Sequence, residues 1–117
     1  MTLHDVKGLL NADILYGEDL LDTQVEWVSS ADMMSDVLAY SKPCSVLLTG
    51  LCNPQVIRTA EMMDIICVVF VRGKVPTDDM LALVRGKKIV LMSTRLYMFS
   101  ACGILYERGF QGGCLDE

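Results

Sequence analysis

The alternation of apolar and polar positions divides the chain into short helices and strands. Apolar residues at helical spacing predict an opening helix between Thr2, a typical N-cap residue, and Asn11. Two short strands are predicted next, at 12–16 and 24–28, with a connection that begins at Gly17. The first part of the chain is therefore expected to mix helix and strand.

From residue 45 onward, predicted strands and helices alternate. The strands are expected at 45–49, 65–71 and 89–92, and the middle one is apolar on both faces, which is typical of a central strand. The helices are expected at about 33–40, 54–63, 78–85 and 94–109. Short connections between alternating strands and helices favour parallel strands joined by right-handed crossovers. We therefore expect an α/β fold: a mostly parallel sheet of about four to five strands with helices on its faces.

Polar residues that can cap helices precede the predicted helices. The candidates are Ser29, Ser30 and Asp32 for the helix at 33–40, Asn53 before Pro54, Thr77 for the helix at 78–85, and Ser93 or Thr94 for the last helix. Asp32 and Asp36 are also four residues apart, a spacing that a metal or paired-carboxylate site can use. Capping and solvation of a helix are the more common roles of such residues.

Length and composition are those of one globular domain. The chain has 117 residues, 52% of them hydrophobic, which is enough to bury a core without metals or disulfides. No linker or repeat interrupts residues 1–110, which we expect to form a single domain. The segment 111–117 contains two glycines and is expected to be a flexible tail.

Charge and hydropathy argue against two classes of partner. Ten Lys and Arg against fifteen Asp and Glu give a net charge of −5, the wrong sign for a nonspecific nucleic-acid binder. The longest wholly apolar run, 65–71, is too short to span a membrane, and the N-terminal residues do not resemble a signal peptide. We expect a cytoplasmic protein that binds neither nucleic acid nor membrane.

The five cysteines are expected to be free thiols. Their number is odd, no C-x-x-C pair occurs, and the single histidine, His4, gives no zinc-ligand spacing with them. We therefore predict no metal and no cofactor. Cys52 is the one candidate nucleophile, because it lies close to a predicted helix N-terminus that would lower its pKa. No general base accompanies it in the sequence, so no catalytic residue is assigned.

Three loops are expected to meet at one edge of the sheet. In an open parallel sheet, ligands bind beyond the carboxyl ends of the strands, here at 49–53, 72–74 and 93–95. The candidate ligand-binding residues are Thr49, Gly50, Asn53, Arg72, Gly73, Lys74, Ser93, Thr94 and Arg95. Their hydroxyls, cations and helix N-terminus suit a phosphate or carboxylate, although the glycine-rich phosphate-binding motifs are absent. The alternative is that the glycines form turns, Thr94 caps a helix and the basic residues are solvated.

Apolar residues exceed what a chain of this length readily buries. Eight methionines are accompanied by Trp27, Tyr40, Tyr97, Phe99, Tyr106 and Phe110. We expect an apolar patch that homodimerisation covers.

Four segments, taken as a set, resemble DRTGG-domain proteins. They are DMMSDVLAY at 32–40, VLLTGLCNPQVIRTAEMMDI at 46–65, VVFVRGKVP at 68–76 and ACGILYERGF at 101–110. The chain resembles a stand-alone DRTGG-domain protein over nearly its whole length. The name-giving pentapeptide is absent, and Thr49-Gly50 stands where a Thr-Gly pair is common in related domains. The resemblance implies a fold similar to the N-terminal domain of HPr kinase/phosphorylase and a regulatory or dimerising role, with catalysis in other domains.

Three functional hypotheses follow. The leading one is a non-enzymatic regulatory module that dimerises, contacts a protein partner and binds a small anionic metabolite or nucleotide at the carboxyl edge of the strands. The second is a purely structural oligomerisation or protein-interaction domain without a ligand. The third is a phosphoryl- or acyl-transfer enzyme that uses Cys52 or Thr49.

Overall fold

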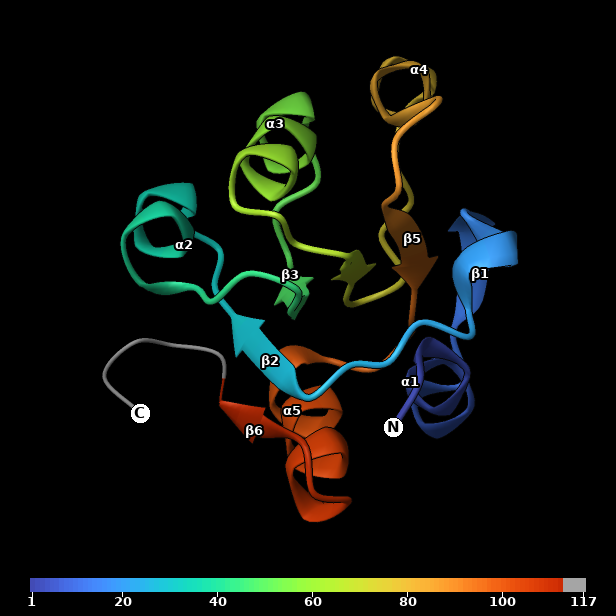
Figure 1. Ribbon diagram of the computed structural model, residues 1–117, viewed down its shortest axis with the longest axis vertical. Helices are drawn as coiled ribbons and strands as arrows, with labels where there is room; N and C mark the ends of the chain where they lie inside the picture. The colour runs from blue at the N-terminus through green and yellow to red at the C-terminus, as the bar shows by residue number, and fades with distance from the viewer. Residues whose placement is uncertain (113–117) are drawn as a thin grey trace.

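The computed structural model describes residues 1–112 and has a six-stranded sheet between two layers of helices (Figure 1). The helices are α1 (Leu3–Leu10), α2 (Met34–Tyr40), α3 (Pro54–Met62), α4 (Asp78–Val84) and α5 (Met98–Glu107), with a short 3-10 helix, η1, at Glu18–Leu20. The strands are β1 (Asp13–Tyr16), β2 (Trp27–Ser30), β3 (Val46–Thr49), β4 (Cys67–Phe70), β5 (Val90–Ser93) and β6 (Gln111–Gly112).

The sheet is parallel except at one edge. Its strand order is β1-β5-β4-β3-β2-β6. Strands β2 to β6 run parallel to their neighbours, whereas β1 is antiparallel to β5. The predicted α/β fold with a mostly parallel sheet is confirmed. The sheet has six strands rather than four or five because β6 adds a short strand beside β2.

Each face of the sheet has its own core. Helices α2, α3 and α4 cover one face, and α1 and α5 cover the other (Figure 1). In β4, Val68 and Phe70 pack in the core under α2–α4, whereas Cys67 and Val69 pack in the core under α1 and α5. All four side chains are fully buried. Burial on both faces is the physical reason for the continuous apolar run in this strand.

The second strand begins at Trp27, so the prediction of a strand at 24–28 is wrong at both ends. Gln24 instead forms an isolated bridge with Thr2, and the Val25 amide donates to the Met1 carbonyl at 2.8 Å. The backbone groups of Gln24 and Val25 therefore hydrogen-bond to the N-terminal residues rather than to a strand of the sheet. Pairing with β3 starts only at Val28.

Two of the predicted helix caps are confirmed. The Asn53 side chain accepts a hydrogen bond from the Gln55 amide at 3.0 Å at the start of α3. The Thr77 hydroxyl accepts one from the Met80 amide at 3.3 Å at the start of α4. Both satisfy amides that the first helical turn leaves free.

Thr2 is the N-cap residue of α1, as predicted. The predicted caps of α2 and α5 are wrong, because the side chains have tertiary partners. Helix α2 begins after Met33 and α5 begins after Tyr97, and neither residue makes a side-chain cap bond. Asp32 instead binds the backbone at the end of β3, and the Thr94 hydroxyl binds the end of α1. A capping motif read along the chain does not reveal these distant partners.

The segment expected to be a flexible tail begins with an ordered strand. The Gln111 amide donates to the Glu26 carbonyl at 3.0 Å, and β6 pairs with the first residues of β2. The rest of the predicted tail, 113–117, lies outside the described residues. Within residues 1–112, no helix combines the length and apolar character needed to cross a membrane.

Candidate functional site

The three loops predicted to carry the site meet at one edge of the sheet. The parallel register places Thr49 beside Phe70, and Phe70 beside Ser93. The end of β2 reaches the same edge, because Ser30 pairs with Leu48. This fourth segment brings in a carboxylate, Asp32, that was not among the predicted site residues.

Asp32 and Arg72 approach Gly50 from two directions. The Gly50 amide donates to Asp32 Oδ1 at 2.7 Å, and the Thr49 hydroxyl lies 3.5 Å from the same oxygen. A Cβ placed on Gly50 would lie 2.8 Å from Arg72 Nη2 and 3.2 Å from Asp32 Oδ1. The missing side chain at position 50 therefore lets a cation and an anion reach the same stretch of backbone.

The loop before α3 satisfies most of its own amides. The Thr49 hydroxyl accepts the Leu51 amide at 3.1 Å, and the Asn53 side chain caps α3. The Gly50 amide is bonded to Asp32. An external anion at 49–53 would have to displace Asp32, so this loop is the weakest part of the predicted anion site.

The loops after β4 and β5 are joined through their backbones. Arg72 and Gly73 both have positive φ, 61° and 69°, a conformation that costs a non-glycine residue about 1 kcal/mol. It directs the Arg72 amide to the Leu96 carbonyl at 2.9 Å and the Gly73 amide to the Thr94 carbonyl at 2.8 Å. These amides already have partners, so a ligand at this edge must be bound mainly by side chains.

The hydroxyls of Ser93 and Thr94 are also committed within the chain. Ser93 donates to the Lys74 carbonyl at 2.6 Å. Thr94, which is 1% exposed, donates to the Leu10 carbonyl at 2.8 Å and accepts the Leu96 amide at 3.2 Å. These two residues hold the edge together, whereas Arg95 is exposed beside them.

A cleft of about 580 Å³ opens at this edge. The end of α1, the start of β1, the loops after β4 and β5, and α5 form its walls. Four of the nine predicted site residues line it, namely Gly73, Ser93, Thr94 and Arg95. The structure thus brings the second and third predicted loops together around one cavity, while Thr49, Gly50 and Asn53 lie outside its lining.

The cleft combines polar and apolar walls. Asn11, Asp13 and Arg95 supply amide, carboxylate and guanidinium groups, and Leu15, Val75 and Ile104 supply apolar surface. Asp13 is present because β1 runs antiparallel to β5, which sets its amino end opposite Ser93.

Three cations at the edge have no carboxylate partner in the part of the chain that the structure describes. Arg72, Lys74 and Arg95 are exposed, and none forms an ion pair with another residue of 1–112. Their charges are therefore free to attract an anion, at the one sheet edge where the predicted loops converge.

Cys52 does not have the environment of an activated nucleophile. Its thiol lies 3.9 Å from the Met80 sulfur, and burial raises the pKa of Cys52, an effect that Lys74 only partly offsets. The predicted lowering of the pKa of Cys52 is wrong, because burial disfavours the charged thiolate and raises the pKa. His4 lies on α1, where it pairs with Asp22 at 3.2 Å.

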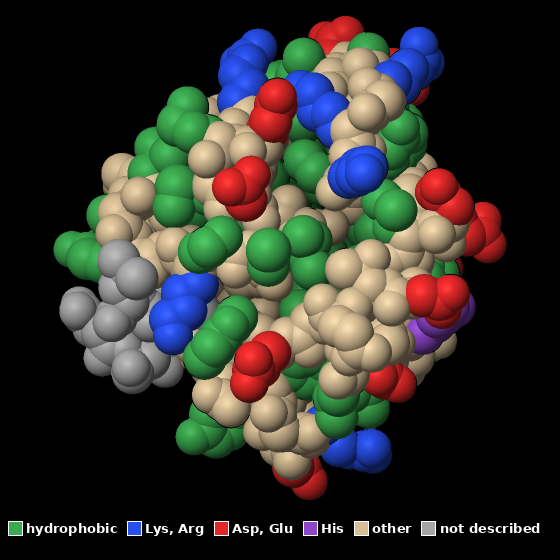
Figure 2. Space-filling model, viewed as in Figure 1, with side chains coloured by type: hydrophobic (Ala, Val, Ile, Leu, Met, Phe, Trp, Pro, Cys, Tyr) green, Lys and Arg blue, Asp and Glu red, His purple; other side chains and the backbone are tan. Residues whose placement is uncertain are grey.

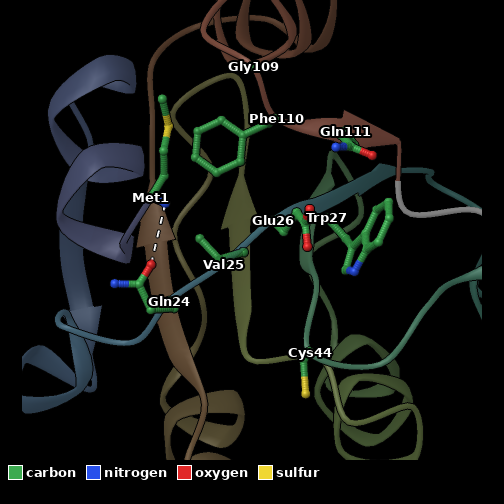
Figure 3. A pocket seen from close by; sticks show the side chains of 9 residues that line it. All are labelled: Met1, Gln24, Val25, Glu26, Trp27, Cys44, Gly109, Phe110 and Gln111. Atoms are coloured by element: carbon green, nitrogen blue, oxygen red, sulfur yellow. Dashed lines mark hydrogen bonds between the residues drawn. The ribbon is translucent and has the colours of Figure 1, made fainter.

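A second hollow, of about 450 Å³, lies at the opposite, amino edge of the strands (Figure 3). Trp27 and Phe110 line it together with one carboxylate, Glu26, and no Lys or Arg side chain. Acidic and basic side chains are interspersed over the molecular face in Figure 2. The hollow at the amino edge therefore lacks a guanidinium of the kind that Arg95 supplies to the cleft.

Comparison with known proteins supports the fold. No model of a known protein family matches the sequence, and no curated protein matches it. A solved structure does match: the CBS and DRTGG domains of the regulatory region of Clostridium perfringens pyrophosphatase, complexed with its activator diadenosine tetraphosphate, with a TM-score of 0.70. The fold is related to that regulatory region. The match covers 89% of this chain and 45% of that structure, at 14% sequence identity. The chain thus corresponds to less than half of that regulatory region, and the likeness extends to the fold alone.

Two residues of the site were missed by sequence reasoning, for one reason. Asp13 and Asp32 reach the carboxyl edge only because of how β1 and β2 are placed in the sheet. The spacing of Asp32 and Asp36 indicated a helix face, but α2 begins after Asp32. Nothing local in the sequence marks either carboxylate as part of this edge.

Proposed function

We propose that the protein is a non-catalytic regulatory module that binds a small phosphate-containing molecule, such as a nucleotide, in the cleft beside Arg95. The observation that carries this proposal is the cleft itself, which joins a guanidinium without a carboxylate partner among residues 1–112 to an apolar wall. Its volume of about 580 Å³ is in the usual range for small-molecule sites, about 300–1,000 Å³.

The lining suits the two halves of a nucleotide. A guanidinium such as that of Arg95 binds phosphate through two parallel hydrogen bonds. Leu15, Val75 and Ile104 offer apolar surface to a base, and Asp13 offers a carboxylate that can accept a hydrogen bond from a sugar hydroxyl. Arg72 and Lys74, exposed on the adjoining loop, add positive charge for further phosphates.

The comparison supports a regulatory role. The structural neighbour is a regulatory region complexed with a nucleotide activator. A related fold in this chain is consistent with the same general task, and the raised pKa of Cys52 gives little support to the enzyme hypothesis.

Self-association is part of the proposal. Several large apolar side chains are exposed, among them Tyr97 at 68%, Tyr106 at 77% and Phe99 at 90%. Such exposure favours a partner surface, which we take to be a second copy of this chain in the first instance. The alternative function, an oligomerisation or protein-interaction domain without a ligand, rests on the same exposed residues and requires the cleft to stay empty.

Thermal unfolding with a panel of nucleotides and phosphorylated metabolites tests the ligand. A ligand at 100 times its Kd stabilises the folded state by about 2.7 kcal/mol, which corresponds to a rise in Tm of roughly 10 °C for a domain of this size. Arg95→Ala should abolish this rise without unfolding the protein, because the side chain is exposed and makes no ion pair within residues 1–112.

Arg58→Ala is the matched control. Arg58 is also exposed, but it lies on α3 on the other face of the sheet. The variant should keep the ligand response of the unmodified chain. If no compound in the panel raises Tm, the ligand proposal is rejected and the purely structural alternative stands. If Arg58→Ala removes the response as completely as Arg95→Ala, the cleft is not the site.

A further inference from the structure

The outer face of α5 carries an unusual combination of residues. Phe99 is 90% exposed and Tyr106 is 77% exposed, although both lie in a helix that packs its other face on the sheet. Between them lies Gly103, which is exposed and would have nothing within 4 Å of an added Cβ. A glycine inside a helix costs about 1 kcal/mol relative to alanine. Contacts within residues 1–112 do not require it here.

Helical geometry places these residues on one stripe. With 3.6 residues per turn, Gly103 lies at the centre of the outward face. Phe99 lies one turn before it and Tyr106 almost one turn after it, both on the same side of the stripe. Ser100 and Glu107 flank it on the other side, and both are exposed. Large side chains thus border a position with no side chain at all.

We propose that α5 is the dimer interface: two copies of this chain pack their α5 helices antiparallel about a two-fold axis that passes beside Gly103. This inference rests on the proposed self-association and gives it a location. A two-fold axis across antiparallel helices sets Phe99 of each copy against Tyr106 of the other, because the two lie on the same side of the stripe at opposite ends. Gly103 lies at the crossing point, where the two backbones come closest.

Charge also favours a second copy as the occupant. Residues 98–106 contain no charged side chain, although the chain as a whole has a net charge of −5. Two acidic molecules can approach through such a face with less repulsion than through other surfaces. The antiparallel arrangement also brings Glu107 to the first turn of the other α5, which has no side-chain cap and no acidic residue of its own. A carboxylate is stabilising at that end of a helix.

The surface around α5 can supply the area a dimer needs. Aromatic side chains bury about 150–250 Å² each, so Phe99 and Tyr106 offer roughly 300–500 Å² of the about 800 Å² that each partner of a stable complex contributes. A groove of about 450 Å³ runs beside the helix on the side of Cys102, between α5 and strands β2 and β6. Phe99 and Tyr106 lie along it, so the aromatic residues of a second copy can extend the contact there.

Sedimentation velocity on the full chain tests the interface. The unmodified protein should sediment as a dimer at micromolar concentration, and Phe99→Glu should weaken the dimer at least 100-fold while circular dichroism stays unchanged. Met62→Glu is the matched control, because Met62 is 72% exposed on α3 in the opposite helix layer. It should remain dimeric.

Gly103→Ala tests whether Gly103 lies where two α5 helices cross or on a helix face without a partner. Alanine should raise the Tm of the monomer, since it is the better helix former, yet weaken the dimer about tenfold or more, because its methyl group intrudes where the helices cross. If Phe99→Glu and Gly103→Ala both form dimers as stable as that of the unmodified chain, the α5 interface is wrong. Self-association and ligand binding then still stand. An unmodified chain that is monomeric at its highest soluble concentration overturns the dimer itself, and the ligand-induced Tm shift is measured independently of both.

Discussion

Thr94→Val should destabilise the protein strongly, although it changes only one hydroxyl group to a methyl group. The Thr94 hydroxyl is 1% exposed and makes two hydrogen bonds, to the Leu10 carbonyl at 2.8 Å and from the Leu96 amide at 3.2 Å. Valine has nearly the same shape, so the change opens no cavity. It leaves the buried carbonyl of Leu10 and the partly buried amide of Leu96 without partners.

The expected cost follows from those two groups. Each buried polar group left unpaired costs about 1–3 kcal/mol, so Thr94→Val should lower the free energy of unfolding by about 2–4 kcal/mol. That is a large part of the total stability of a typical domain, about 5–15 kcal/mol. Urea unfolding followed by circular dichroism measures the change, and the m-value should stay constant if the denatured state is unaffected.

Thr59→Val is the matched control for this experiment. Thr59 is 4% exposed on α3, and its hydroxyl makes no side-chain hydrogen bond within the described part of the chain. The same change there should alter the free energy of unfolding by less than about 0.5 kcal/mol. Equal effects of the two substitutions would show that Thr94 does not tie α1 to the end of β5, and the account of this edge would be refuted.

Two further predictions concern the first loop of the edge. Asp32→Ala should lower the free energy of unfolding in urea by about 1.5–3 kcal/mol, because it removes a charge-assisted hydrogen bond to the buried Gly50 amide. Asp36→Ala, at an exposed site on α2, should change the free energy of unfolding by less than about 0.5 kcal/mol. Equal costs of the two substitutions would contradict the role of Asp32. Iodoacetamide should alkylate Cys52 more slowly at neutral pH than the exposed Cys44, because burial raises the pKa of Cys52 and keeps its thiol protonated. Peptide mass spectrometry measures the rate of labelling at each cysteine. Faster labelling of Cys52 than of Cys44 would revive the enzyme hypothesis.

Most of the fold could be predicted because its signals are local. The apolar run around β4 predicted a strand covered on both faces, and the alternation of strands and helices after residue 45 predicted that β3, β4 and β5 run parallel. Asn53 and Thr77 cap the helices that they were expected to cap. The signals of the strands, helices and caps each lie within a few residues along the chain, and the parallel pairing follows from the alternation of strands and helices.

The candidate site could be predicted only in part. The sequence alone indicated that the loops after β4 and β5 would meet, because the carboxyl ends of parallel strands share an edge, and Arg95 was among the residues named. It could not show that the Thr94 hydroxyl is taken up by Leu10 or that Asp32 binds Gly50. Those partners are 84 and 18 residues away in the sequence, and either polar side chain could equally have capped the helix that follows it.

The sequence by itself therefore determined most of the helices and strands, the mostly parallel sheet and the sheet edge at which polar groups collect, because hydrophobic periodicity records which face of each element is buried. The tertiary structure alone decided which groups at that edge remain free. The antiparallel placement of β1 brought Asp13 to the cleft. Hydrogen bonds between the loops after β4 and β5 occupy amides and a hydroxyl of these loops, so those groups are not free to bind a ligand. The same holds for the outer face of α5, since only packing of the helix shows that Phe99 points away from the core.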